Sequence, residues 1–483
     1  LPTHAQRMAP RQRAGFSCLL GGLSWRGSFW LRARSAQTGE YGKQEGVLLA
    51  HIALLFVALA FGNEVDDLMY QGQVDRAVLA ARDLVMSGDD IADDEVYIDL
   101  LLSSGVAQTA ETYYRAQLAK GPTEADNHYL LGRALVSADA AAASYQAALK
   151  IDPNHARSHM GMGAIHRSNG ALEASQSAYR RALKGDESLG EAWSGLSAAL
   201  VMSGDYAGAL AVAREALVAT PNESSPYLSI ALLSPKEAVT ILTAGAKAVP
   251  NDPMIYETLT EAYLANNKGA AAKSAIAKAL SIDGRRPAAL TLALYADAMS
   301  RGLLDATGYA ALVTARQQVA KDPSKALAAL NKLVAAYPQC GLVYVARASA
   351  HTALGDGTAS MTDLGRALEH DENNFDAHAA LGMQFLNAGH PHKALPHLMK
   401  ANEFLVGDVG LGVGLATAQI ALGDVDSART ALERLYGSHG KDVRVVLAYA
   451  RVLAHDEEFE SAYKLLKISL AGTMDGRVAI ALA

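Results

Sequence analysis

Histidine is the residue type in this chain whose spacing comes closest to metal chemistry. His390, His392 and His397 follow one another near a predicted turn. An H-x-H pair with a third imidazole offers nitrogen ligands of the kind that Zn²⁺ and Cu²⁺ accept. No thiolate or carboxylate stands nearby in the sequence to complete the ligand set. We therefore predict no metal site.

Glycine-rich and catalytic motifs are equally incomplete. Gly410, Gly412 and Gly414 resemble the start of a dinucleotide-binding loop. That motif needs a preceding strand and a third glycine three residues after the second, where Leu415 stands. The chain has no Ser-His-Asp order, no G-x-S-x-G sequence and no paired-carboxylate context. We predict no catalytic residue, no cofactor and no enzymatic activity.

Composition and charge narrow the class of partner. The chain has 483 residues, of which 50% are hydrophobic and 6% aromatic. Residues 1–46 carry seven basic groups against Glu40 and Glu45, so the rest of the chain holds 36 of the 43 basic and 48 of the 50 acidic side chains. Because binding to phosphate backbones needs clustered Lys and Arg, this acidic body predicts that nucleic acid is not a partner. Two cysteines, Cys18 and Cys340, are too few for a disulfide framework.

The N-terminal part of the chain differs from the rest. Residues 1–46 read as a basic, disordered leader. Residues 47–62 are sixteen residues without formal charge, which is short for a membrane span and typical of the core of a signal peptide. We predict a signal peptide or signal anchor at 47–62, with possible membrane attachment, and a buried first helix as the alternative.

A 34-residue period dominates the remainder of the chain. Trp193 lies 34 residues after His159, and His378 lies 34 after Tyr344. The glycines repeat in the same way, at Gly355, Gly389 and Gly423. Self-similarity at this period indicates one supersecondary unit that is stacked many times. His159 and His378 occupy the position of Trp193 and Tyr344, so we interpret them, like His166 and His351 at the repeat's tyrosine position, as packing residues.

The residues at these positions resemble the tetratricopeptide repeat, whose pattern is W-x2-L-G-x2-Y, A-x3-F and P over 34 residues. In the unit from Gly190, Trp193 and Leu196 fill the first helix, Gly204 and Asp205 form the turn, Ala209 and Ala213 fill the second helix, and Pro221 ends it. The resemblance implies an all-α fold, a right-handed α-solenoid of about twelve helix-turn-helix repeats. Small residues such as Ala209 and Ala216 are expected at the helix crossings.

The predicted solenoid covers residues 63–476, with a tail at 477–483. Residues 287–340 are too long for one unit, and the extra stretch of about 303–321 reads as an additional helix before Pro323. We expect an irregular unit there.

The resemblance also implies where a partner binds, because first helices line the concave groove in this family. The predicted partner-binding residues are Tyr129, Arg133, Arg157, Met160, Arg167, Met202, Met254, Glu257, Glu261, Met383 and Asn387. Further candidates on the same helices are Met299, Arg444 and Arg451. Methionines with little charge favour a peptide or amphipathic helix of another protein. Oligomeric state and partner identity do not follow from the sequence.

The sequence therefore predicts a non-enzymatic scaffold or assembly factor that binds segments of other proteins. If residues 47–62 insert, the repeats lie outside the cytoplasm, exported or membrane-anchored. The alternative is an organelle-targeted assembly factor or co-chaperone of mitochondrial type, or a cytoplasmic protein.

Overall fold

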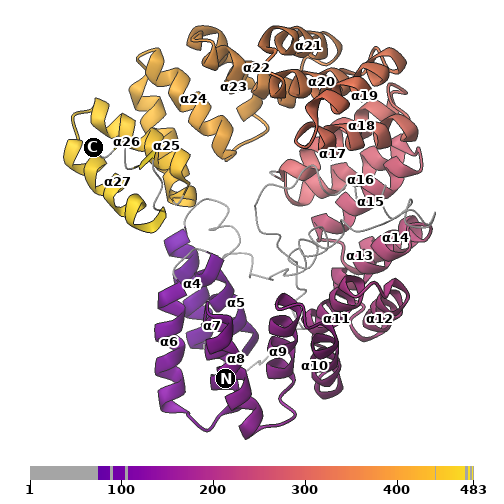
Figure 1. Cartoon of the computed structure of the whole chain (residues 1–483), viewed down its shortest axis with the longest axis vertical. Coiled ribbons are helices and arrows are strands. Elements are labelled where there is room, and N and C mark those ends of the chain that lie inside the picture. Colours follow the sequence, from indigo (N-terminus) through magenta and orange to yellow (C-terminus); the bar gives the residue numbers. More distant parts are fainter. Residues whose placement is uncertain are drawn as a thin grey trace, which may run out of the picture. The chain divides into compact units, whose positions relative to one another are not determined.

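The computed structural model describes residues 74–87, 91–103, 107–284, 286–440, 442–473, 477–478 and 481. These residues form 24 α-helices and no strand (Figure 1). This confirms the prediction of an all-α chain with about twelve helix pairs. The predicted leader at 1–46, the apolar run at 47–62 and most of the tail lie outside the described residues. None of the helices that are described is both long and apolar enough to span a bilayer.

The chain divides into two compact units, from Asp75 to Leu259 and from Thr260 onward. The first unit contains α4 (Val74–Ser87), α5 (Ile91–Ser103), α6 (Ala107–Lys120), α7 (Ala125–Ala134), α8 (Ala138–Ile151), α9 (Ala156–Ser168), α10 (Leu172–Gly185), α11 (Gly190–Met202), α12 (Tyr206–Ala219), α13 (Ser224–Leu233) and α14 (Ala238–Ala248). The boundary falls in α15 (Pro253–Ala265). The second unit contains α16 (Gly269–Ile282), α17 (Pro287–Ser300), α18 (Ala306–Val319), α19 (Pro323–Ala336), α20 (Gly341–Ala353), α21 (Gly357–His370), α22 (Phe375–Asn387), α23 (Pro391–Asn402), α24 (Val409–Ala421), α25 (Val425–His439), α26 (Val443–His455) and α27 (Phe459–Thr473).

Helices pack in pairs, and we call the members of each pair its first and second helix. In the first unit α9 packs against α10 and α11 against α12, and in the second unit α20 packs against α21 and α22 against α23 (Figure 1). First helices of successive pairs also touch, as α9 does with α11 and α22 with α24. Each unit is therefore a stack in which first helices lie beside first helices.

In three of the described pairs, α11/α12, α20/α21 and α24/α25, the turn between the helices has a Gly-Asp sequence. Gly204 has a φ of +82°, a left-handed conformation that only glycine adopts without strain. The next residue, Asp205, caps α12 by accepting a hydrogen bond from the backbone N–H of Gly208 at 2.8 Å. The Gly-Asp pairs before α21 and α25 have the same positive φ and the same aspartate cap.

Small residues occupy the crossings between the helices. Ala209 and Ala216 are 0% and 3% exposed, as the repeat pattern predicts. Gly195 of α11 lies so close to α10 that an added Cβ would stand 2.3 Å from Cζ of Tyr179. Larger side chains at these places would separate the two helices.

The irregular region holds three helices, α17, α18 and α19, where a regular repeat has two. The predicted additional stretch at about 303–321 contains α18. By its neighbours, however, α18 behaves as a regular first helix, because it packs against its own partner α19 and against the next first helix, α20. α17 packs against α16, and its turn into α18 has the positive φ, at Gly302, and the aspartate cap, at Asp305, of the turns inside the other pairs.

A candidate partner-binding site

Seven first helices of the described chain share one hydrogen bond, and it fixes their register. In each, an aromatic side chain reaches the backbone carbonyl six residues earlier: His128 to Pro122, His159 to Pro153, Trp193 to Glu187, Tyr227 to Pro221, Tyr256 to Pro250, Tyr344 to Pro338 and His378 to Glu372, at 2.8–3.2 Å. A carbonyl can only accept, so Nε2 of each of these histidines carries the hydrogen. Histidine replaces tryptophan and tyrosine here because all three end in a donor.

The residue after this aromatic position and the residue four further on lie on one side of the helix. We call these paired positions the first-helix face. In the first unit they are Glu95/Asp99, Tyr129/Arg133, Met160/Ala164, Ser194/Ala198 and Leu228/Leu232, at the boundary Glu257/Glu261, and in the second unit Val345/Ser349, Ala379/Met383, Val413/Thr417 and Leu447/Arg451. The two units carry different chemistry at these equivalent positions.

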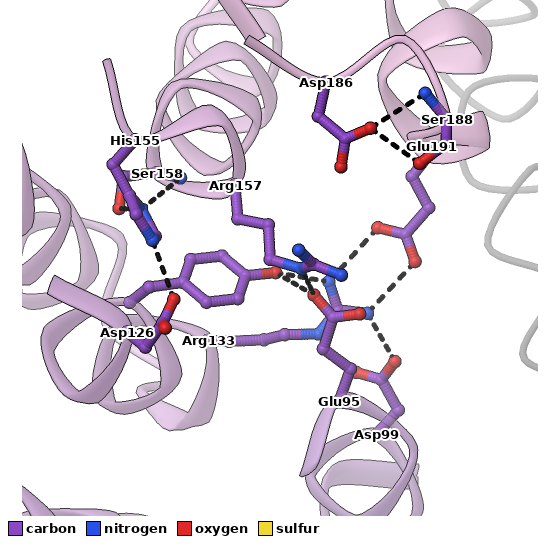
Figure 2. A network of polar contacts seen from close by, with 11 residues as sticks. Glu95, Asp99, Asp126, Arg133, His155, Arg157, Ser158, Asp186, Ser188 and Glu191 are labelled. Atoms are coloured by element: carbon purple, nitrogen blue, oxygen red, sulfur yellow. Dashed lines mark hydrogen bonds and ion pairs between the residues drawn. The ribbon is translucent and has the colours of Figure 1, made fainter. Parts of the chain in front are cut away.

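In the first unit Arg133 lies at the centre of an ionic network (Figure 2). Its guanidinium donates to Asp99 of α5 at 2.5 Å and to both carboxylate oxygens of Glu191 of α11 at 3.1 and 3.2 Å. It also donates to the hydroxyl of Tyr129 at 3.3 Å. Only 14% of the Arg133 side chain is exposed. One arginine therefore connects first helices on both sides of its own, and its reach to Glu191 passes over α9.

A second set of contacts crosses the first. Glu95 of α5 accepts a hydrogen bond from the hydroxyl of Tyr129 at 2.6 Å and another from Nε of Arg157, on α9, at 3.2 Å (Figure 2). Arg157 thus reaches back over α7, as Arg133 reaches forward over α9. Three acidic and two basic side chains, with one tyrosine, join α5, α7, α9 and α11 along the first-helix face.

Burial sets the electrostatics of this network. It raises the pKa of Asp99 to about 6, against the opposing effect of Arg133. Burial also raises the pKa of Tyr129 well above 10. For Arg133 burial opposes the charge, but Glu191, Tyr129 and Asp99 outweigh it and raise the pKa. Nε of Arg133 is buried without a hydrogen-bond partner among the described residues. Three of the predicted binding residues are thus brought together: Arg133 bonds to Tyr129, and Tyr129 and Arg157 both bond to Glu95.

The other predicted residues of α9, α11 and α15 divide by burial. Met160 is 5% exposed, and Glu257 and Glu261 are 1% and 6% exposed. These side chains belong to the interior, and Met160 in particular is not the open surface side chain that the register predicts. Arg167, Met202 and Met254 are half-buried, and Arg167 lies 5.9 Å from the ring centroid of Tyr179.

The first-helix face of the second unit is neutral from α20 to α24. Its positions hold Val, Ser, Ala, Met, Val and Thr, and Met383 and Val413 are half-buried. Met383 lies against α24, where a Cβ on Gly414 would stand 2.5 Å from its sulfur. The missing side chain of Gly414 makes room for the methionine. Asn387, also predicted, is exposed at the end of α22. Met299 is buried, whereas Arg444 and Arg451 are exposed.

The three histidines with metal-like spacing do not converge. His390 and His392 lie near each other, with ring centroids 6.1 Å apart. Nδ1 of His397 instead lies 2.8 Å from Nδ1 of His378, and burial and His378 lower the pKa of His397. No group of three or more metal-ligating side chains gathers among the described residues. The glycines at 410, 412 and 414 lie within or at the start of helix α24, as the register predicts.

Stacked antiparallel helix pairs of this kind define the class of α-solenoid repeat proteins. A family model of the tetratricopeptide repeat matches residues 137–188, 165–224 and 413–475, in both units of the chain. The chain therefore contains tetratricopeptide repeats, as its 34-residue pattern predicts.

Several solved structures resemble the chain. Cut9–Hcn1 of the APC/C is 16% identical with a TM-score of 0.31, over 86% of this chain and 94% of that one. Yeast Tom70 is 12% identical with a TM-score of 0.29, over 76% and 92%. A mutant of MamA is 20% identical with a TM-score of 0.31, over 34% and 95%. No curated protein matches the chain significantly in sequence.

Proposed function

We propose that this protein is a scaffold that binds other proteins, and that the first-helix face of the second unit takes an apolar segment of its partner. Tetratricopeptide repeats support the general role, because stacked repeats present long surfaces that are used for binding. The choice of unit rests on the contrast between the two faces. In the first unit the large side chains of α5 and α7 satisfy one another, whereas in the second unit the face is neutral.

One observation carries the proposal. From Val345 to Thr417 the first-helix face, whose positions are all described, has no charged side chain, yet Met383 and Val413 stay half-buried on adjacent first helices. An apolar surface of this kind suits an amphipathic helix or an extended apolar segment. Methionine is well adapted to such a surface, because its unbranched, polarizable side chain repacks against different partners. The contact energy should concentrate on these few large side chains.

The test compares two charged variants of the whole chain in cells. Met383→Lys combined with Val413→Lys places charge on the first-helix face. Met399→Lys makes the same change on α23, a second helix, where the side chain is already 55% exposed. We expect proximity labelling of the partners to fall at least about tenfold in the face variant, a loss of about 1.4 kcal/mol, and to persist in the control.

A recovered partner segment should then bind the purified chain as a peptide, and lose affinity for the face variant alone. Equal labelling by both variants, with both folded by circular dichroism, would place the partner elsewhere. Met399→Lys losing partners as strongly as the face variant would have the same meaning.

Export is a separate proposal. We propose that residues 47–62 direct the repeats out of the cytoplasm, on the basis of their sixteen uncharged residues and the basic sequence before them. N-terminal sequencing of the mature protein tests it. A start near Phe61 or Asn63 supports export, whereas a start within residues 1–46 favours the organelle-targeted assembly factor.

A further inference from the structure

The irregular region of the second unit encloses a small cavity. It lies where the C-terminal end of α17 meets the N-terminal ends of α20 and α22, and its lining includes Arg301, Cys340, Gly341 and Asn374. Its volume of about 30 Å³ holds one or two waters or a single small polar group.

Asn374 supplies a hydrogen-bond donor that the protein leaves unused. The residue is 0% exposed and caps α22, with Oδ1 accepting from the backbone N–H of Ala377 at 3.0 Å. That bond fixes the orientation of the amide, since a backbone N–H needs an acceptor. Nδ2 is consequently a buried donor, and it has no partner in the part of the chain that the structure describes. A buried donor in this position calls for an acceptor inside the cavity.

The rest of the lining adds positive potential. α20 is a thirteen-residue helix that begins at Gly341, so the N–H groups of Gly341 and Leu342 belong to its first turn. Such groups have no acceptor within the helix and carry the positive end of its dipole. Arg301, which follows α17, brings a guanidinium that is half exposed to solvent.

Two carboxylates also line the cavity, and they limit the charge that it accepts. Asp297 is bound by Lys273 at 2.7 Å and by Arg301 at 3.3 Å. Asp371 accepts from the backbone N–H of Asn373 at 3.2 Å. Both already have partners, but their charge disfavours a dianion. The remaining titratable groups of the lining are the buried thiol of Cys340 and the imidazole of His370, which stacks on Tyr344.

We propose that this cavity binds a single carboxylate group. Nδ2 of Asn374 and the backbone N–H of Gly341 donate to its oxygens, and Arg301 supplies the opposite charge. A carboxylate has the volume and the single negative charge that the cavity accepts. The group comes either from a free small acid or from the end or an acidic side chain of a peptide. The site lies apart from the first-helix face of the proposed function and does not depend on it.

The test measures the affinity of the purified whole chain for ¹³C-formate by NMR titration at constant ionic strength. Asn374→Asp retains a good helix cap but replaces the buried donor by a carboxylate. Asn373→Asp adds the same charge at the neighbouring exposed residue, which does not line the cavity. We expect Asn374→Asp to weaken formate binding by roughly 10- to 100-fold, the loss typical of one hydrogen bond to a charged group. Asn373→Asp should change it by less than about threefold.

Arg301→Gln provides a second variant that leaves the helix cap intact, and it should weaken formate binding by roughly tenfold or more. Wild-type affinity in both cavity variants, or no formate binding by the wild type, overturns the proposal and leaves the cavity to water. Two peptides, one with a free C-terminus and the other amidated, distinguish the sources. If only the peptide with the free C-terminus competes with formate, the carboxylate is that of a peptide end. If neither peptide competes, the ligand is a small acid.

Discussion

The same positions of the same repeat carry opposite chemistry in the two units of this protein. In the first unit the first-helix face of α5 and α7 is ionic: Arg133 bonds to first helices on both sides of α7, and Glu95 bonds to α7 and α9. In the second unit the face from α20 to α24 is uncharged, and Met383 lies on a glycine. The backbone repeat thus sets the positions of these side chains. Their chemistry decides whether they bond to one another or leave a surface that a partner can contact.

The two faces differ because their side chains differ in length and charge. Long side chains with complementary charge span the distance to the next first helix and beyond it, and a buried ion pair is stable only when its partners are present. Short neutral side chains do not reach across and leave the face partly exposed. Ion pairs on the face therefore hold several first helices in fixed relative positions. A neutral face makes no such contacts between them.

The largest expected effect tests the ionic face. Arg133→Met removes one charge and leaves the buried carboxylate of Asp99 without its partner, so we expect the free energy of unfolding to fall by about 3–5 kcal/mol. Urea denaturation measures this. Arg429 is the control, because it also bonds three carboxylates, but near the surface. Arg429→Met should have little effect, and equal losses would mean that the Arg133 network is solvated.

The pH dependence of stability should show the cost of burying Asp99. Its pKa is about 6 in the folded chain and near 4 when unfolded, so between these values the folded state binds the extra proton. Its contribution to stability is therefore complete below about pH 4 and is lost as the pH rises through about 6, on the order of 2–3 kcal/mol. The free energy of unfolding of the wild type minus that of Asp99→Asn should fall across this window. A flat or rising difference would contradict the assignment.

Two glycine substitutions compare the rigidity of the two units. A Cβ on Gly195 would meet the buried ring of Tyr179 at 2.3 Å, and overpacking of about 1–3 kcal/mol should exceed the gain in helix propensity of about 1 kcal/mol. A Cβ on Gly414 would meet only the flexible end of Met383, so Gly414→Ala should be close to neutral. Thermal midpoints check both, and a larger loss for Gly414→Ala would show that the neutral face is as tightly packed.

The smallest effect concerns the register hydrogen bond that both units share. Tyr227→Phe removes the donor to the carbonyl of Pro221, at a cost of about 0.5–1.5 kcal/mol. Tyr344→Phe makes the equivalent change in the second unit. We expect similar losses in denaturant midpoint, because the contact is local and repeats unchanged. A marked difference between the two would mean that the units do not share this contact equally.

Much of the fold could be read from the sequence because its determinants are local. The glycine that must adopt a positive φ at Gly204, the cap at Asp205 and the alanines at the crossings all act within one repeat. The equivalence of His159 and His378 with tryptophan and tyrosine also followed from spacing, and the shared hydrogen bond explains it. The packing of α18 against α19 and α20 did not follow, since it depends on contacts between separate helices.

By itself the sequence determined the repeat, its helical class and the helix face on which each candidate side chain stands. These depend on residues within a few turns of one another. Only the tertiary structure decided what those side chains do there. Arg133 meets Glu191 from 58 positions away, and Asn374, whose Nδ2 has no partner among the described residues, lines a cavity between α17, α20 and α22. Burial, charge pairing and unpaired donors depend on contacts between several repeats. A 34-residue pattern describes one repeat and does not show which residues of other repeats a side chain contacts.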